Sequence, residues 1–371
     1  MSVPPREPDR LDRRALRFRP LAERKSRVIF PRDAISPDAD PRPLPPAGEA
    51  LLDEAASRIR AARAGGRSVM LATGAHAIKN GLGPVLIALA RDGWLTHLAT
   101  NGAGIINDWE LAFQGATSED VRANVAIGEF GAWEETGRFL NLGLLAGAYR
   151  GLGYGASIGS LISNEGLDIP PRTELGAAAR GFARNADRAS AAIDLLAALE
   201  EAGIPSGPVH IPHPGRDWSV QAAAWQLGVP CTGHPMIGHD IIYEHPLASG
   251  SAIGRTGMRD FLCFAEGVSR LSGGVYLSVG SAVMSPMIFE KSLSMARNIA
   301  RQRAETIEDH YLLVADLTPS TWDWASGGEP PADDPAYYLR YCKSFSRMGG
   351  TLRYLVADNR DLLLGLRRRL R

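Results

Sequence analysis

Three histidines and two carboxylates stand close together in the segment HPMIGHDIIYEHP: His234, His239, Asp240, Glu244 and His245. Imidazole and carboxylate groups exchange protons, so such a cluster suits acid–base catalysis or the binding of a polar substrate. The same groups bind zinc or iron, but their spacing here matches no metal-binding signature. Structural hydrogen bonding of the loop is a further interpretation. We predict His239 and Asp240 as catalytic groups and assign no metal site.

Two loops of small residues, 101–104 (NGAG) and 280–282 (GSA), each follow an apolar stretch and precede a helical one. Small residues let a ligand approach the backbone, and the free N–H groups at a helix start bind phosphate or ribose. Neither loop is a GxGxxG fingerprint or a P-loop. The alternative is that the glycines only form tight turns. Asp358, at the end of another apolar stretch, is placed to accept hydrogen bonds from ribose hydroxyls.

Lys343 lies between aromatic residues in YYLRYCKSFSRMGG. Aromatic neighbours would desolvate its amine, lower its pKa and make it a nucleophile that forms Schiff bases. An ordinary exposed charge is the other interpretation, because most lysines are exposed. We predict Lys79 and Lys291 to be solvated residues on helices.

The elements that position these residues alternate along the chain. Apolar stretches at 68–73 and 95–100 flank a helical pattern at 81–93, which is a βαβ unit and so implies a parallel sheet. Further strands are predicted at 208–211, 228–233, 275–280, 310–317 and 352–358, with helices at 217–227, 257–270 and 287–303 and at the C-terminus. The fold class predicted is α/β, with a single Rossmann-like doubly wound and mostly parallel sheet covered by helices on both faces. Ligands bind such sheets at the carboxyl ends of the strands.

The flanking regions have a different composition. Residues 1–47 are rich in Pro, Arg and Asp and predict an extended N-terminal arm that docks on the body or on a neighbouring subunit. Residues 48–371 form the α/β domain. Within it, the helical and Ala/Gly-rich segment 129–205 is predicted to be a cap or an oligomer surface.

Composition excludes several classes of function. The chain has 41 Lys plus Arg and 41 Asp plus Glu, and this zero net charge argues against a dedicated nucleic-acid binder. No apolar run is long enough to span a membrane, and the N-terminus has no apolar signal region. The three cysteines are widely spaced and form no CxxC pair, which is typical of the reducing cytoplasm.

The order of the motifs resembles the deoxyhypusine synthase family. The resemblance rests on ATGAHAIKNGL, LTHLATNGAGIINDWELA, VPCTGHPMIGHDIIYEHP, VYLSVGSAVMSPMIFEKSLSMARN and HYLLVADLT, and on Pro335 standing eight residues before Lys343. It implies NAD as the cofactor, a small amine such as a polyamine as the substrate, and a homotetramer with shared active sites. It also implies an imine on Lys343 that carries an aminoalkyl group to an acceptor.

The resemblance also assigns roles to individual positions. The residues implied to contact NAD are Ala75, His76, Asn101, Gly102, Ala103, Gly280, Ser281, Asp358 and Asn359. Those implied to bind the substrate are Asn107, Asp108, His234, Ser285, Asp323 and Tyr341. Asn107, Ser285 and Tyr341 depart from the glutamate, histidine and tryptophan of the family, so the polyamine pocket is eroded.

Three functions are open from the sequence. The first is the NAD-dependent transferase with its lysine imine. The second is a lyase or isomerase that recycles NAD on a hydroxylated or less cationic molecule, for which His76 and the histidines of 234–245 are suited. The third is a nucleotide-binding protein without catalysis.

Overall fold

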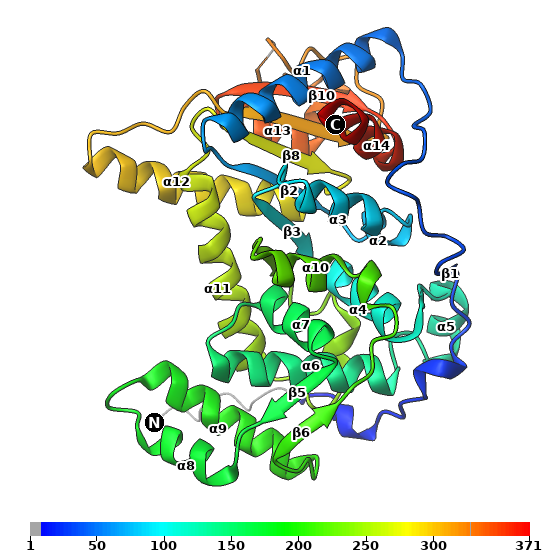
Figure 1. Cartoon of the computed structure of the whole chain (residues 1–371), viewed down its shortest axis with the longest axis vertical. Coiled ribbons are helices and arrows are strands. Elements are labelled where there is room, and N and C mark those ends of the chain that lie inside the picture. The colour runs from blue at the N-terminus through cyan, green and yellow to red at the C-terminus, as the bar shows by residue number, and fades with distance from the viewer. Residues whose placement is uncertain (1–8, 327) are drawn as a thin grey trace, which may run out of the picture.

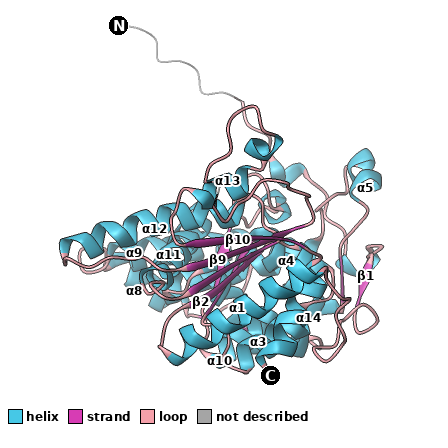
Figure 2. Ribbon diagram, turned by 90° about the horizontal axis from the view of Figure 1, so that it is seen from above, coloured by secondary structure: helices cyan, strands magenta, loops and turns pink. Residues whose placement is uncertain are grey.

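The computed structural model describes residues 9–326 and 328–371. Its centre is a sheet of six parallel strands (Figures 1 and 2). In order across the sheet they are β10 (Thr351–Val356), β9 (Tyr311–Asp316), β8 (Val275–Val279), β2 (Val69–Thr73), β3 (His97–Asn101) and β7 (Cys231–His234). The chain thus adds β2, β3 and β7 in one direction and β8, β9 and β10 in the other. This is the doubly wound Rossmann order, and it confirms the predicted fold class.

Helices cover both faces of the sheet (Figure 2). One face packs on α1 (Pro46–Ala64), α3 (Gly83–Arg91), α10 (Val220–Leu227) and α14 (Asn359–Leu370). The other packs on α11 (Gly250–Ser269), α12 (Met284–Gln302) and α13 (Arg340–Ser346). Every residue of β2 and β8 is buried, which explains why both strands are continuous apolar runs and not alternating patterns.

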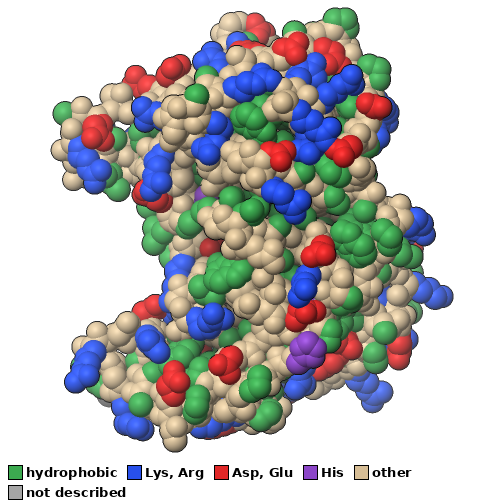
Figure 3. All heavy atoms as spheres, in the orientation of Figure 1, with side chains coloured by type: hydrophobic (Ala, Val, Ile, Leu, Met, Phe, Trp, Pro, Cys, Tyr) green, Lys and Arg blue, Asp and Glu red, His purple; other side chains and the backbone are tan. Residues whose placement is uncertain are grey.

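A second, mostly helical lobe lies beside the sheet (Figure 1). It contains α6 (Glu134–Arg150), α7 (Tyr154–Ser163), α8 (Arg172–Arg180), α9 (Ala186–Glu201) and the pair β5 (Gly166–Ile169) and β6 (Gly207–His210). The predicted strand 208–211 is therefore misplaced, because it forms β6, which pairs antiparallel with β5 outside the main sheet. The lobe has its own apolar core, and α11 runs between it and the sheet (Figure 1). Figure 3 shows the notch that this arrangement leaves on one face.

The N-terminal arm docks on the body of its own chain. Its short strand β1 (Val28–Ile29) pairs antiparallel with β4 (Ala116–Thr117), and the side chains of Leu21 and Phe30 are buried. The arm also carries the 3-10 turns Arg13–Ala15 and Leu21–Glu23. Figure 1 shows it running along the edge of the molecule from the helical lobe to α1. The part of the arm before residue 9 lies outside the described residues.

The remaining elements surround the carboxyl edge of the sheet. The helices are α2 (His76–Lys79), α4 (Gly102–Gln114) and α5 (Val121–Ile127), and the 3-10 turns are Arg216–Trp218, Ile241–Glu244 and Pro335–Tyr338. No helix in the described part of the chain has the length and apolar character needed to cross a bilayer.

Candidate functional site

The chain reverses its direction of winding between β2 and β8, and two glycines form the turns there. A Cβ added to Gly74 would lie 2.6 Å from the carbonyl oxygen of Gly280, so only glycine permits this approach of the two backbones. Gly280 itself has φ of 57°, in the left-handed region that glycine adopts most readily. The adjacent positions Ala75 and Ser281 are buried in the same turns. The structure thus brings the predicted cofactor positions after β2 and β8 together.

The start of α14 joins this site. A Cβ on Gly280 would lie 2.7 Å from the side-chain nitrogen of Asn359, so the first residue of the helix contacts the β8 turn. The side chain of the neighbouring Asp358 makes structural contacts instead. The Asp358 carboxylate caps the helix by accepting from the Arg360 amide at 2.8 Å and lies 3.4 Å from the Arg42 guanidinium. Asn359 is therefore better placed than Asp358 to contact a ligand at these turns.

The start of α4 is already paired with an anion. The Asn101 side chain accepts from the Gly104 amide at 2.9 Å and caps the helix. A Cβ on Gly102 would overlap the carboxylate of Asp240, which lies against this end of the helix. A negative charge is stabilised there by the helix dipole. This contact favours a place for Gly102 and Ala103 beside a substrate and not beside a phosphate, and their assignment to NAD stays a prediction.

A cavity of about 140 Å³ runs along one face of α4. The helix contributes Ala103, Ile106, Asn107 and Glu110, whose spacing places them on a single face over about 10 Å. The other lining residues come from five further segments of the chain: Arg24, Lys79, Ser118, Glu119, Val121, Phe130, His239, Asp240 and Ile241. Segments following β2, β3 and β7 thus meet in this cavity, at the carboxyl edge of the sheet.

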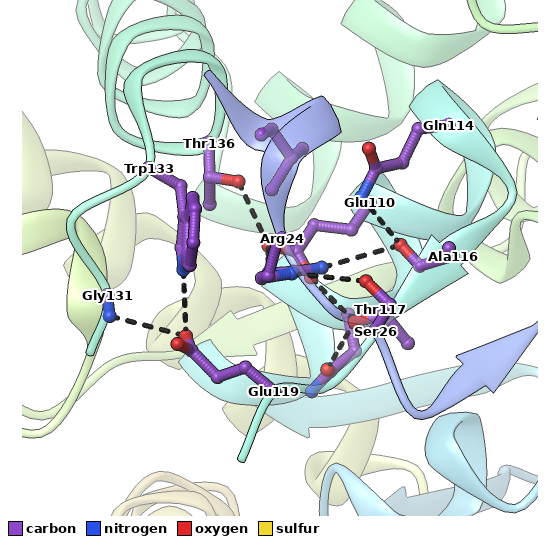
Figure 4. A network of polar contacts seen from close by, with 12 residues as sticks. Arg24, Ser26, Glu110, Gln114, Ala116, Thr117, Glu119, Gly131, Trp133 and Thr136 are labelled. Carbon is purple, nitrogen blue, oxygen red and sulfur yellow. Dashed lines mark hydrogen bonds and ion pairs between the residues drawn. The ribbon is translucent and has the colours of Figure 1, made fainter. Parts of the chain in front are cut away.

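The deep end of the cavity is a closed polar network (Figure 4). The Arg24 guanidinium donates to both oxygens of Glu110, at 2.7 and 2.8 Å, and each side chain is only 2% exposed. The hydroxyls of Thr117 and Thr136 donate to the same carboxylate at 2.6 and 2.9 Å. A buried ion pair offsets its desolvation only with such additional hydrogen bonds. The charge and the hydrogen bonds of the Glu110 carboxylate are therefore met by protein groups and not by a ligand.

Two more lining residues are also satisfied by the protein. Glu119 accepts from the Trp133 indole at 3.0 Å and from the Gly131 amide at 3.2 Å (Figure 4). Asn107 donates to the Ala103 carbonyl at 2.6 Å, and its side-chain oxygen lies 2.7 Å from the Thr117 hydroxyl, whose single proton it shares with Glu110. Asn107 thus lines the cavity, as expected of a substrate residue, but both ends of its amide already have partners.

Asp240 and His239 lie at the open end. The Asp240 carboxylate is buried and accepts from the Tyr243 hydroxyl at 2.7 Å. Burial raises the pKa of Asp240, and the Tyr243 hydrogen bond offsets only part of that effect. The side chain of His239 is exposed. The structure places both predicted catalytic groups on the wall of one cavity, while their roles stay predictions.

The buried carboxylate of Asp260 holds the start of α7 against the end of β7. Asp260 on α11 accepts from the amides of Gly155 at 2.8 Å and Gly233 at 2.6 Å, and so joins α7 to the end of β7. Burial raises the pKa of Asp260 to about 7, although the backbone hydrogen bonds lower it. Tyr154, which follows Gly153 at the start of α7, packs against Gly233.

The other histidines of the sequence cluster lie elsewhere. His234 shares the Thr232 hydroxyl with His97, at 2.9 and 3.0 Å, and burial lowers the pKa of His234 to about 3. His245 packs edge-on against Phe18 and lies near Glu134. Neither histidine, nor Glu244, lines the cavity. Among the described residues no group of three or more His, Cys, Asp or Glu is arranged to hold a metal ion.

Lys343 is far from this cavity in the sheet topology. It lies on α13, which packs against α12 and β10, while β3 and β7 are at the other end of the strand order. Its amine lies 3.3 Å from the centre of the Tyr337 ring, in a cation–π contact. Within one chain the sheet order does not bring Lys343 beside His239 and Asp240, and a catalytic role for Lys343 stays a prediction.

The remaining predicted residues have mainly structural contacts. Asp108 is buried and accepts from the Ser219 hydroxyl and from the amides at the start of α10. Ser285 is buried against the Tyr276 hydroxyl at 2.8 Å, and Tyr341 shares a hydrogen bond with Tyr354. Asp323 is exposed and caps a local turn, and His76 is exposed on α2. A substrate role for Asp108, Ser285, Tyr341 and Asp323 stays a prediction that these contacts do not favour.

The polar lining residues that were not predicted as site residues include Arg24, Lys79, Ser118 and Glu119. Lys79 is in the loop TGAHAIKNG, which the sequence placed after a strand, but we expected a solvated lysine. Ser118 has φ of 65°, and that strain has no signal in the sequence. Arg24 belongs to the arm, more than 80 residues before its partner Glu110, so only the fold could join them.

No protein-family model matches the chain, and no curated protein matches it. Solved structures similar to it include ArgZ, an arginine dihydrolase from the ornithine–ammonia cycle in Cyanobacteria, in its apo form. That match has 14% identity and a TM-score of 0.42, and covers 87% of this chain and 32% of that one. Another is AgrE in a ternary complex with ornithine and NAD+, with 14% identity, a TM-score of 0.44 and coverage of 89% and 34%. This chain spans about a third of the length of both proteins.

A third similar structure is a conserved LOR/SDH protein from Methanococcus maripaludis S2. It has 12% identity and a TM-score of 0.42, and the match covers 90% of this chain and 72% of that one. Similarity this distant carries no argument about chemistry. The resemblance to the deoxyhypusine synthase family is wrong, because no family model matches and these similar structures are other proteins.

Proposed function

We propose that the protein is an NAD-dependent enzyme that acts on a small amine bound in the cavity along α4. The observation that carries this proposal is the position of the cavity. It is lined by segments that follow β2, β3 and β7, beside the point where the doubly wound sheet reverses direction. That edge is where such sheets bind nucleotides and substrates.

The residues at the β2 and β8 turns fit a dinucleotide. Gly74 and Gly280 let the two turns pack closely against each other and against Asn359, and the Ser281 hydroxyl and the Asn359 amide add hydrogen-bonding groups beside them. Gly74, Ala75, Gly280, Ser281 and Asn359 would hold the cofactor. When bound, NAD would supply a hydride acceptor.

Asp240 is the group suited to the amine. Its buried carboxylate can pair with an ammonium ion and, with a pKa raised by burial, can take up a proton closer to neutral pH than an exposed aspartate. His239, exposed at the same end of the cavity, can pass that proton to solvent. Lys343 has no part in this mechanism.

The variant Asp240→Asn tests the proposal. We expect kcat/KM for amine oxidation to fall about 10²- to 10⁴-fold, because an amide can neither pair with the ammonium nor accept its proton. NAD affinity, followed by the fluorescence of bound NADH, should stay unchanged. Asp53→Asn, at an exposed carboxylate on α1 that pairs with Arg369, is the matched control and should retain activity.

Two results would count against the proposal. One is the failure of the wild-type protein to bind NADH. The other is full activity of Asp240→Asn. Turnover that needs catalytic NAD without accumulating NADH would identify an enzyme that recycles its cofactor.

A further inference from the structure

The polar groups that line the α4 cavity divide into those that the protein satisfies and those with free capacity. Arg24, Glu110, Glu119 and Asn107 are bound to one another or to neighbouring hydroxyls, amides and the Trp133 indole, as described above. The charges and hydrogen-bonding atoms of these residues are therefore already paired within the protein and are not the main groups available to a ligand. The ligand must be matched to the groups that remain.

Lys79 is one group with free capacity. Its ammonium lines the cavity and makes no hydrogen bond or ion pair with any residue that the structure describes. Lys79 is only partly exposed, at the end of α2, which packs against α4. A partly buried ammonium without a carboxylate partner is matched by an anion.

Ser118 is the second such group. Its hydroxyl oxygen is buried and has no hydrogen-bond partner among the described residues, although the residue lines the cavity. Its backbone has φ of 65°, a conformation that residues other than glycine adopt rarely. Strained backbone and an unpaired buried hydroxyl on one residue are typical of positions that contact a ligand.

Asp240 is the third group, with the opposite charge. Its carboxylate accepts a hydrogen bond from the Tyr243 hydroxyl and one from the Met236 backbone, while two carboxylate oxygens can accept about four. Apart from the exposed imidazole of His239, the free groups therefore comprise one cation, one anion and one hydroxyl. A ligand with only positive charge would leave Lys79 facing a like charge, and one with only negative charge would do the same at Asp240.

We propose that the α4 cavity binds a small zwitterion, whose ammonium pairs with Asp240 and whose carboxylate pairs with Lys79 and the Ser118 hydroxyl. The volume of about 140 Å³ suits a compact molecule, because sites for drug-sized ligands span about 300–1,000 Å³. This substrate class rests on the proposed function for its role in catalysis, but the binding itself does not need NAD.

Calorimetric titration without NAD tests the proposal. The probes are two isomeric zwitterions, 5-aminopentanoate and L-2-aminopentanoate, with 1,5-diaminopentane and pentanoate as matched cation and anion. We expect one of the zwitterions to bind roughly 10- to 100-fold more tightly than the diamine or pentanoate, the range for a charge-assisted hydrogen bond. The proposal is overturned if neither zwitterion binds or if the diamine binds as tightly.

Variants assign the two ends of the ligand. Lys79→Met should remove the preference for the zwitterion over the diamine, and Asp240→Asn should remove the preference over pentanoate. Ser118→Gly, which removes the hydroxyl and accepts the same φ, should weaken zwitterion binding several-fold. Lys291→Met, at an exposed lysine paired with Glu290, is the control and should bind all probes like the wild type. Unchanged preferences in Lys79→Met would contradict the proposal.

A separate titration with NADH distinguishes this inference from the proposed function. Zwitterion binding by a protein that does not bind NADH would support the substrate class and contradict the NAD-dependent enzyme. NADH binding without zwitterion binding would support the NAD-dependent enzyme and contradict the substrate class.

Discussion

The turns after β2 and β8 and the cavity along α4 lie at the same edge of the sheet but are built differently. The turns are made of backbone: Gly74 and Gly280 approach so closely that a methyl group would not fit between them. The cavity is made of side chains brought from the arm, α2, α4, the segment after β4 and the loop after β7. Added atoms should therefore destabilise the turns after β2 and β8, whereas lost charges and changes in pH should destabilise the region of the α4 cavity.

The largest effect is expected from removing a charge at the deep end of the cavity. Arg24→Ala leaves the Glu110 carboxylate buried without its cation, and we expect the free energy of unfolding to fall by about 3–5 kcal/mol. Urea denaturation measures it. Arg14→Ala breaks an ion pair with Glu201 in which both side chains are exposed, and should change the free energy of unfolding far less. Equal losses in the two variants would contradict the difference between buried and exposed pairs.

The next effect is a dependence of stability on pH. Asp260 has a pKa of about 7 when folded and an ordinary value near 3.8 when unfolded. Its contribution to stability is fully present below pH 3.8 and is lost as pH rises to about 7, because only the unfolded state releases the proton in that window. The loss amounts to up to about 4 kcal/mol.

Asp260→Asn isolates this contribution. The amide oxygen can still accept from Gly155 and Gly233 but does not ionise. We therefore expect the variant to lose less stability than the wild type between pH 4 and pH 7, as measured by urea denaturation at each pH. Parallel pH profiles for the two proteins would show that Asp260 ionises normally in the folded state.

The smallest effect is expected from a methyl group at the turns. Gly74→Ala would force Gly280 to move, and we expect a loss of about 1–3 kcal/mol together with weaker NADH binding. Gly254→Ala is the control, because nothing lies within 4 Å of its Cβ position in the middle of α11, so it should gain about 0.5–1 kcal/mol. NADH affinity unchanged in Gly74→Ala would contradict a cofactor role for this turn.

The sequence predicted the sheet region better than the cavity. The strands of the main sheet are short apolar runs with glycine or polar residues at their ends, and six of the seven predicted strands lie in it. The exception, 208–211, has the same apolar pattern but pairs with β5, because a run of residues does not identify its partner strand. The predicted loops after β2, β3, β7 and β8 do lie at one edge of the sheet.

The sequence says less about which of the predicted site residues share one place, for a physical reason. His234, His239 and His245 are close in sequence, but only His239 lines the cavity, because the strand end and the 3-10 turn direct the three side chains to different places. Lys343 was assigned by its spacing from Pro335, and spacing says nothing about which end of a sheet a helix covers. Asp108 and Asp240 look alike in the sequence, yet one caps α10 and the other faces the cavity.

Local patterns thus determine the elements of this protein and the edge at which they end, because burial and turn geometry act on neighbouring residues. The tertiary structure decides which polar groups remain available to a ligand. Glu110 is neutralised by Arg24 from the arm, whereas Lys79 has no partner among the described residues. Such pairing depends on segments far apart in the chain, and so on the packing that brings them together.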